Sequence, residues 1–216
     1  MNSYYGEAQQ DKFVTKMLNE KRDGYFVEIG SNHPINCNNS YLLESKLNWK
    51  GIMVEYSNQW LNLYQEHRKN SIHLIADGTT IDYRDVLDTN NFPTEIDYLQ
   101  IDLEATNGSS IKALEIFDKD VFDKYKFATI TFEHDIWVTD KYRMRERSRE
   151  ILEKRGYYRV IDDVHNKESK YVYEDWYIHP DLVNLDYAKS VREKNIKNYE
   201  ENGKTNKSIC WSNIEY

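Results

Sequence analysis

Cysteine and proline are scarce in this sequence, which has two cysteines and three prolines among 216 residues. Cys37 and Cys210 fit no spacing typical of metal ligands, and nothing else in the sequence supports a disulfide between them. This cysteine usage favours a reducing, intracellular compartment. So few prolines provide no rigid spacer between domains, and the length suits one domain with a sizeable core.

The sequence also lacks a long hydrophobic run and an excess of positive charge. No segment approaches the roughly 18 apolar residues of a membrane span, and the N-terminus MNSYYGEAQQDKF has no signal-peptide pattern. The net charge is −8 and the isoelectric point about 5.3, so nucleic acid is not expected as the main partner. We expect a cytoplasmic protein. Abundant Asn, Lys, Tyr and Ile suggest an AT-rich genome, such as that of a virus whose protein acts in the host cytoplasm.

Aromatic residues make up 14% of the chain, which is typical of a folded protein rather than a disordered one. Apolar runs alternate with helical patterns, and this order predicts an α/β, Rossmann-like fold with a mostly parallel sheet and helices on both faces. The expected strands cover 25–30, 51–56, 71–77, 96–104, 127–135, 157–163 and 171–180. The expected helices cover 7–20, 39–47, 57–69, 109–118 and 139–155.

The last two expected strands are separated by a short polar turn, which favours a hairpin over a crossover. The seventh strand should therefore run antiparallel to the rest of the sheet. We assign residues 1–186 to this domain, and 187–216 to a polar C-terminal helix and a loose end of the same domain.

Glycine is scarce as well, and the turn after the first expected strand, FVEIGSN, contains only Gly30. Ligands of open α/β sheets bind at the carboxyl ends of the strands. Acidic residues occupy these ends in five expected strands: Glu28, Glu55, Asp77, Asp102, Glu104, Glu133 and Asp135. This pattern predicts one acidic rim along the sheet. Acids that are merely exposed to solvent would not be expected at the end of every one of these strands.

The type of glycine turn narrows the choice of ligand. A dinucleotide site needs G-x-G-x-x-G around a pyrophosphate, whereas Glu28 stands beside Gly30 and would repel an anion. The turn favours a cationic ligand without phosphate, such as S-adenosylmethionine. Glu55 is then expected to accept hydrogen bonds from both ribose hydroxyls, and Asp77 from the adenine amino group. For each carboxylate the alternative is a capping or surface role.

Several motifs occur in order over residues 3–183 and resemble the FkbM-like methyltransferases. They are QQDKF (9–13), FVEIGSN (26–32), NSYLLE (39–44), WKGIMVEY (49–56), DYLQIDLE (97–104), ITFEHD (130–135) and EDWYIHP (174–180). The sequence departs from the family pattern in the opening YGEAQQDKF, where Glu7 and Ala8 intrude. It departs again after Glu104, where ATNG replaces an earlier glycine.

The resemblance implies a class I S-adenosylmethionine-dependent methyltransferase that transfers a methyl group to oxygen. The cofactor-binding residues are then expected to be Glu28, Gly30, Ser31, Asn32, Ser40, Glu55, Tyr56, Ala76, Asp77, Gly78 and Asp102. The expected acceptor is a sugar hydroxyl of a glycan or glycosylated product, because acids and aromatic residues share the rim and because the family modifies such products. An acceptor from another class of natural product is the alternative.

A sugar hydroxyl is a weak acid, so its methylation requires a general base or a divalent cation that lowers its pKa. Asp102, Glu133 and His134 are the candidate catalytic residues. The same three residues are the candidate ligands of Mg²⁺ or Mn²⁺. The alternatives are that the acids only orient substrate hydroxyls and that His134 is structural.

Three further features carry weaker predictions. The arginines of 139–155 are expected to form a solvated face with ion pairs to Glu146 and Glu150, and phosphate binding is the alternative. Asp162, Asp163, His165 and the EDW segment of 174–176 are expected to be structural. Trp137 directly follows the acidic end of the fifth strand, which marks it as a candidate for contact with the acceptor.

Two other classes of function remain open at this point. An NAD-linked oxidoreductase would need a second glycine near Gly30, and the sequence has none there. A non-catalytic binding module would keep the fold without the chemistry. The chain could also be one module of a larger protein that builds glycans.

Overall fold

The computed structural model describes residues 4–167, 171–202 and 206–216, with side chains described outside 200–206. The strands are β1 (Tyr25–Ile29), β2 (Lys50–Glu55), β3 (Ser71–Ile75), β4 (Glu95–Ile101), β5 (Lys126–Glu133), β6 (Tyr158–His165), β7 (Val172–Ile178), β8 (Glu200–Asn202) and β9 (Asn206–Cys210). The α-helices are α1 (Gln10–Met17), α2 (Tyr41–Leu47), α3 (Leu61–His67), α4 (Tyr83–Thr89), α5 (Ser109–Ile116), α6 (Met144–Lys154) and α7 (Leu185–Ile196). Short helical turns are η1 (Asn58–Trp60), η2 (Ala105–Asn107), η3 (Phe117–Val121) and η4 (Trp211–Asn213).

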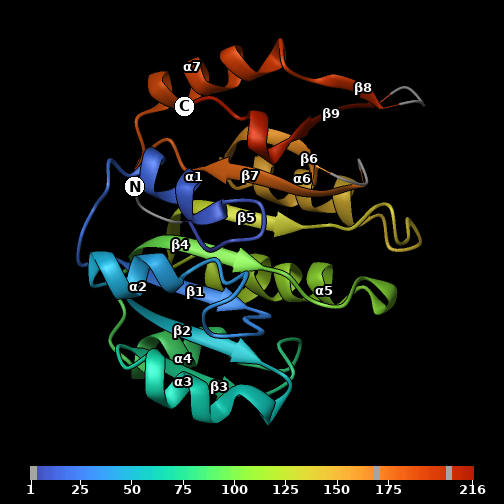
Figure 1. Cartoon of the computed structure of the whole chain (residues 1–216). Coiled ribbons are helices and arrows are strands. Elements are labelled where there is room, and N and C mark those ends of the chain that lie inside the picture. Colours follow the sequence, from blue (N-terminus) through green and yellow to red (C-terminus); the bar gives the residue numbers. More distant parts are fainter. Residues whose placement is uncertain (1–3, 168–170, 203–205) are drawn as a thin grey trace.

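The strands form one sheet in the order β3-β2-β1-β4-β5-β7-β6-β9-β8 (Figure 1). β1 to β5 are parallel, and β7 is antiparallel to both β5 and β6. The seven predicted strands and the closing hairpin are therefore confirmed. The strand order reverses between β1 and β4, which is the switch point where ligands bind in such sheets.

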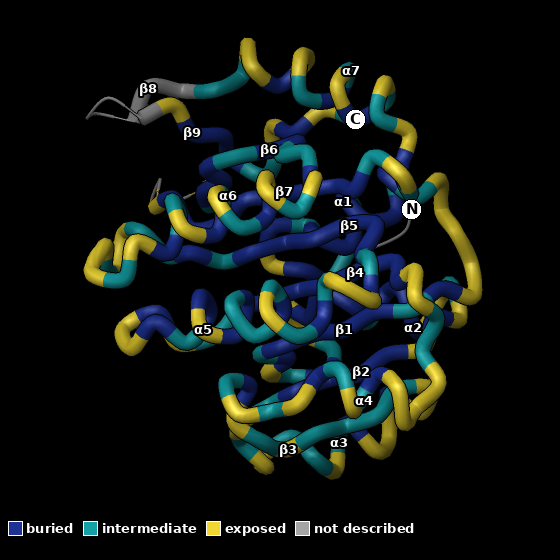
Figure 2. Tube along the Cα trace, turned by 180° about the vertical axis from the view of Figure 1, so that it is seen from behind, coloured by how far each residue is buried: buried dark blue, intermediate teal, exposed yellow. Residues whose placement is uncertain are grey.

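The sheet has a hydrophobic core on each face, and the tube view shows this buried centre (Figure 2). One core packs against α4, α5 and α6, and the other against α1, α2, α3 and α7. Helical periodicity explains α6, since Met144, Ser148 and Leu152 lie four residues apart and are all buried. None of the helices in the described residues is long and apolar enough to span a bilayer.

The structure corrects the expectation of a loose end after α7. β9 pairs with β6 through Ile209 opposite Val164, and Ile209 is fully buried. The sequence pattern did not predict α4, which lies between β3 and β4. Both segments are short and polar, so their few apolar residues did not form a recognisable period.

Candidate functional site

A cavity of about 700 Å³ lies at the carboxyl ends of the parallel strands. Its lining residues are Gly30, Asn32, Glu55, Tyr56, Asp77, Gly78, Asp102, Leu103, Glu104, Ala105, Asn107, Ser109 and Asp135. Five of these are acidic, and this lining contains no lysine, arginine or histidine. Five of the seven acids of the predicted rim therefore face one cavity, whereas Glu28 and Glu133 are not in its lining.

Gly30 makes the close approach of β1 and β4 possible. It has a φ of +83°, and a Cβ at this position would lie 1.6 Å from the carbonyl oxygen of Asp102. The Asp102 amide donates to the carbonyl of Ile29 at 2.9 Å, and the Gly30 amide donates to that of Val54 at 2.9 Å. Only glycine fits this turn, because another side chain would separate the strand ends that bound the cavity.

Glu28 lies beneath the cavity rather than in its wall. Its carboxylate accepts hydrogen bonds from the Ser40 hydroxyl (2.6 Å), the Asn39 amide (3.1 Å) and the Asn38 side chain (3.2 Å). Burial raises the pKa of Glu28, and the charge of Arg68 opposes this rise. Glu28 and Ser40 were predicted to contact the cofactor. Their side chains instead hydrogen-bond to one another and hold the loop over 38–40.

Arg68 completes this support, and nothing in the sequence singled it out. It is fully buried and donates to Glu44 (2.8 Å), Asn38 (2.8 Å) and Ser40 (2.6 Å). A fourth contact, to the carbonyl of Pro34 at 3.1 Å, ties it to the segment that precedes this loop. One guanidinium therefore fixes the segment that follows the glycine turn. A single arginine at a helix end has no sequence signal of such a role.

Ser31 and Asn32 continue the turn in different environments. Ser31 is buried and lies 2.9 Å from the hydroxyl of Tyr64, outside the cavity lining. Asn32 lines the cavity, and its side-chain oxygen accepts a hydrogen bond from Trp60 at 3.1 Å. Of this pair the structure places only Asn32 where a ligand would touch it.

Glu55 is held in position by two backbone amides. It accepts hydrogen bonds from the amides of Asn32 and Ser57, both at 2.8 Å. Each carboxylate oxygen has a second lone pair for a further donor. Tyr56 follows it at the cavity edge and is 78% exposed. This geometry agrees with the predicted contact to paired hydroxyls.

Asp77 and Gly78 form the wall at the end of β3. Asp77 accepts hydrogen bonds from the amide (2.8 Å) and hydroxyl (2.7 Å) of Thr79, and these bonds lower its pKa. The side chain is thus an ionised acceptor. Ala76 lies outside the lining, and its amide donates to the carbonyl of Glu55 at 3.0 Å, which links the two strand ends.

The carboxyl groups of Asp102, Glu133 and Asp135 interact with one another beside this cavity. Burial raises the pKa of Asp102 to about 7, while a hydrogen bond with Glu133 lowers it. Burial and the charge of Asp102 raise the pKa of Glu133 well above its ordinary range. Burial also raises the pKa of Asp135. Both carboxyl groups therefore keep a proton to higher pH than an ordinary acid does, and the rise is larger for Glu133.

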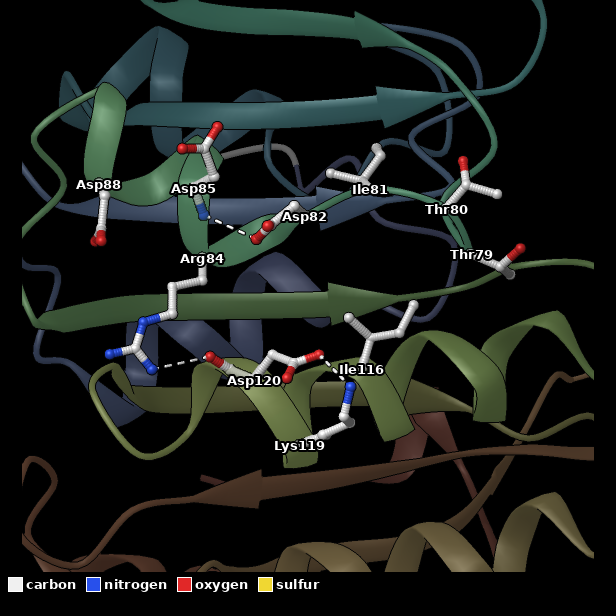
Figure 3. A pocket seen from close by; sticks show the side chains of 10 residues that line it. All are labelled: Thr79, Thr80, Ile81, Asp82, Arg84, Asp85, Asp88, Ile116, Lys119 and Asp120. Carbon is white, nitrogen blue, oxygen red and sulfur yellow. Dashed lines mark hydrogen bonds and ion pairs between the residues drawn. The ribbon is translucent and has the colours of Figure 1, made fainter.

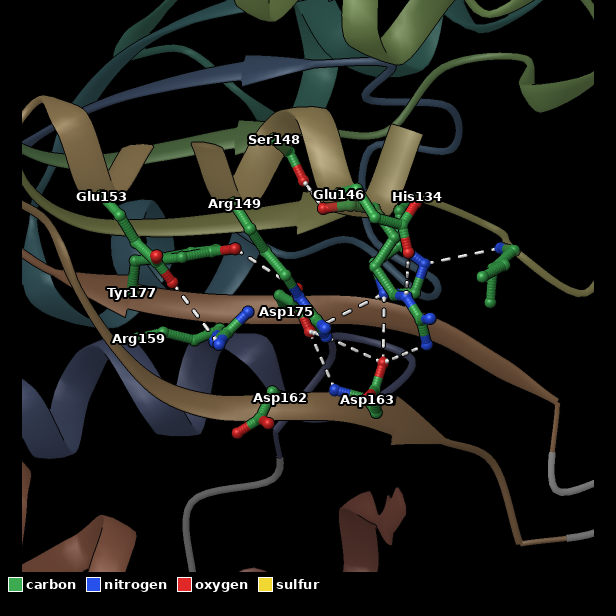
Figure 4. Close-up of polar contacts among 12 residues, drawn as sticks. His134, Glu146, Ser148, Arg149, Glu153, Arg159, Asp162, Asp163, Asp175 and Tyr177 are labelled. Atoms are coloured by element: carbon green, nitrogen blue, oxygen red, sulfur yellow. Dashed lines mark hydrogen bonds and ion pairs between the residues drawn. The ribbon is translucent and has the colours of Figure 1, made fainter. Parts of the chain in front are cut away.

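His134 points to the opposite face of the sheet from Glu133, as successive residues of a strand do. It is fully buried, and its Nε2 lies 3.7 Å from Asp175 and 3.9 Å from Asp163 (Figure 4). The cavity lining does not include it. His134 therefore cannot act as the base at this cavity, and it cannot join Asp102 and Glu133 around one metal ion.

A different group, His134 with Asp163 and Asp175, has metal-ligating atoms within 4.8 Å of one another in the described part of the chain. The carboxylates of this group already accept hydrogen bonds from arginines. Arg149 donates to Asp175 at 2.7 Å and to Asp163 at 2.9 Å, and Arg145 donates to Asp163 at 3.2 Å. Burial alone would raise the pKa of Asp175, but His134 and Arg149 hold it below its ordinary value. The cluster is a balanced ion-pair network, and a divalent cation would have to displace its guanidinium groups.

This network corrects the expected solvated face of α6. Arg143 does pair with Glu150, at 3.6 Å, on the exposed side. Arg145 and Arg149, however, reach inward to the β6–β7 hairpin. The prediction that Asp163 and Asp175 are structural agrees with this arrangement.

Glu174 is an acidic residue near the site, and the sequence did not predict that it is buried beside other acids. It lies directly opposite Glu133 in the β5–β7 pairing and is 1% exposed. Gln10 of α1 donates to it at 3.0 Å. Burial, followed by the charge of Asp102, raises the pKa of Glu174 to about 8. The strand pairing that places these acids together is a tertiary contact.

A second cavity, of about 630 Å³, lies between α4 and the α5–η3 segment (Figure 3). Arg84 and Lys119 line it, and Arg84 donates to the carbonyl of Asp120 at 3.2 Å. None of the predicted site residues lines this cavity. Its lining comes from α4, the α5–η3 segment and the loop after β3 that contains Thr79 and Thr80.

Comparison with known proteins identifies the fold. No family model matches this sequence, and no curated protein matches it either. A solved structure assigned as an rRNA-methylase, from Clostridium thermocellum, is similar over 82% of this chain and 99% of its own, with a TM-score of 0.54 at 9% identity. The METTL16 MTase domain matches over 79% of this chain and 66% of its own, with a TM-score of 0.54 at 10% identity.

A human methyltransferase 10 domain containing protein is similar as well, over 83% of this chain and 84% of its own, with a TM-score of 0.51 at 10% identity. The chain has the fold of class I S-adenosylmethionine-dependent methyltransferases. At these identities the likeness establishes the fold alone. The FkbM family is not confirmed, and the resemblance to it remains an interpretation of the motifs.

Proposed function

We propose that this protein is an S-adenosylmethionine-dependent methyltransferase that binds its cofactor in the strand-end cavity. The observation that carries the proposal is a pair of oriented carboxylates, Glu55 and Asp77, beside a turn with the single glycine Gly30. Carboxylates suit ribose hydroxyls, an adenine amino group and a cationic sulfonium amino acid. All charged residues of this lining are acids and would repel a pyrophosphate, which argues against NAD.

We further propose that the acceptor is a sugar hydroxyl. Asp102, Glu104 and Asp135 line the cavity, where they can accept hydrogen bonds from hydroxyl groups. An acceptor with a phosphate backbone would be repelled by these groups, since the lining supplies no cation. The charge of the site therefore favours a neutral, hydroxyl-rich acceptor over RNA.

Asp102 is the proposed general base. When bound, the cofactor would be held by Glu55 and Asp77 and would supply a sulfonium-activated methyl group, with a thioether as the leaving group. Asp102 takes the acceptor's proton, and a pKa of about 7 suits this role at neutral pH. Glu133, which shares a hydrogen bond with Asp102, keeps the second carboxyl group protonated and holds the base in place. This route needs no metal ligand from His134.

Calorimetry with S-adenosylmethionine tests the cofactor first, with Glu55→Gln as the variant and Glu66→Gln on α3 as the exposed control. We expect binding by the wild type and the control, and at least about tenfold weaker binding by Glu55→Gln, because lost hydrogen bonds to a charged group are worth about 1.5–3 kcal/mol. Absence of binding by the wild type would refute the proposal and leave a non-catalytic module.

Methyl transfer to a panel of methyl glycosides tests the reaction. Asp102→Asn should retain cofactor binding and lose about 100-fold or more in turnover, since general-base catalysis contributes that much. Excess chelator should not change the wild-type rate. A rate that disappears with chelator and returns with Mg²⁺ or Mn²⁺ would instead require a metal-assisted mechanism.

A further inference from the structure

Two aromatic rings are stacked next to Asp135, a residue that lines the strand-end cavity. Trp137 follows β5 and Tyr171 precedes β7, and their ring centroids lie 4.5 Å apart at an interplanar angle of 10°. Because β7 is antiparallel to β5, its beginning lies at the same sheet edge as the end of β5 (Figure 1). Two segments distant in sequence thus build one flat surface.

This aromatic pair is exposed in a way that most large apolar side chains here are not. Trp137 is 51% exposed and Tyr171 is 50% exposed, and the adjacent Val138 is 37% exposed. Each ring covers one face of the other, so about half of the surface of each residue is exposed to solvent. Exposed apolar patches of this kind next to a cavity are typical of binding surfaces.

The pair is connected to the proposed catalytic end of the cavity. The indole Nε1 of Trp137 donates to Asp135 at 2.9 Å, and Asp135 lines the cavity in a left-handed backbone conformation with φ 43°. The hydrogen bond fixes the orientation of the indole relative to the carboxylate. A ligand that touches the outer face of the ring pair would therefore lie beside Asp135.

We propose that Trp137 and Tyr171 form a stacking platform for the ring of a neutral carbohydrate acceptor and determine which acceptors are used. A pyranose ring has an apolar C–H face that packs on an aromatic ring and hydroxyl edges that bond to carboxylates. Asp135 supplies such a carboxylate at the edge of this platform. The proposal rests on the proposed function for its reaction, but ring binding can be measured without catalysis.

The charges of the same loop fit a neutral acceptor. Lys141 lies over the ring of Tyr142 at 4.9 Å, and Arg143 pairs with Glu150 at 3.6 Å. Both cations between β5 and α6 therefore already have partners. A phosphate group on the acceptor would compete with these contacts, whereas a neutral ring would not.

Saturation-transfer NMR with a panel of methyl glycosides, with and without S-adenosylmethionine, tests the platform. Trp137→Ala should weaken glycoside binding about tenfold, the size expected for one aromatic stacking contact, and Trp137→Phe should restore most of it. The matched control is Ile196→Ala at the end of α7, whose side chain is also 51% exposed. It should bind glycosides as the wild type does.

Kinetics separate a binding role from a structural one. Trp137→Ala and Tyr171→Ala should raise the KM for the acceptor, with the Kd for S-adenosylmethionine and the Tm unchanged. Equal glycoside affinity of wild type and Trp137→Ala would overturn the platform. So would a wild type that binds the cofactor but no glycoside, or that binds an RNA oligonucleotide instead, and these results would leave the proposed methyltransferase intact. Failure to bind the cofactor would refute the proposed function alone.

Discussion

Replacing Glu174 by glutamine should change how the stability of this protein depends on pH. Glu174 is 1% exposed, and burial raises its pKa from about 4.5 to about 8 in the folded state. The folded protein therefore favours the protonated form, and stability is lost as the pH rises from the unfolded pKa to the folded one. Glutamine mimics the protonated acid and can still accept the hydrogen bond from Gln10.

The magnitude follows from the size of the shift. A rise from 4.5 to about 8 corresponds to about 4–5 kcal/mol in the free energy of unfolding, at about 1.4 kcal/mol per pH unit. The wild type should therefore lose stability relative to Glu174→Gln between pH 4.5 and 8. Above pH 8 the difference should become constant, with the variant more stable.

Urea unfolding at half-unit steps from pH 4.5 to 9 measures this difference directly. Glu66→Gln, which removes a carboxylate whose side chain is 68% exposed, is the control and should follow the wild-type curve. Parallel pH curves for the wild type and Glu174→Gln would show that Glu174 ionises normally in the folded protein. The assignment of a buried acid cluster at the β5–β7 pairing would then be wrong.

Three further predictions follow from the same structure. Gly30→Ala should lower the stability by about 3 kcal/mol or more, because a positive φ costs about 1–2 kcal/mol and the new Cβ overlaps the backbone of Asp102; an unchanged Tm would contradict this. Arg68→Met should cost about 3–5 kcal/mol by leaving buried Glu44 without its ion pair; an unchanged Tm would refute the ion-pair explanation. Arg149→Met should destabilise by a similar amount through Asp175, without changing the Kd for S-adenosylmethionine in calorimetry; a weakened Kd would connect this network to the cavity.

Element types were largely predictable because they depend on local patterns. Apolar runs of five to eight residues bounded by polar turns predicted β1 to β7, and helical periods predicted α1 and α6. α4 and β9 were missed because each is short and stabilised by packing that no local window contains. Ile209 of β9, for example, is buried only because β6 lies beside it.

The residues of the candidate site also differ in whether local sequence patterns predicted their position. Gly30, Glu55 and Asp77 were found from the sequence because each follows a strand, and parallel strands bring their carboxyl ends to one edge. His134 was assigned to the wrong side because its neighbour Glu133 ends the strand and the side chains alternate across the sheet. Alternation along EHD favours opposite faces for His134 and Glu133 unless the strand ends first, and the sequence does not show where it ends.

By itself, then, the sequence determined an α/β fold with acidic residues at the strand ends and a turn that contains a single glycine. These follow from hydrophobic period and from the order of the strands along the chain, which can be read without the tertiary structure. The tertiary structure decided that no other residue fits at Gly30, which acids lie side by side, which arginines are buried and which aromatic rings meet beside the cavity. Those outcomes depend on burial and on distances between residues such as Glu133 and Glu174, 41 positions apart in the chain and directly paired across two strands.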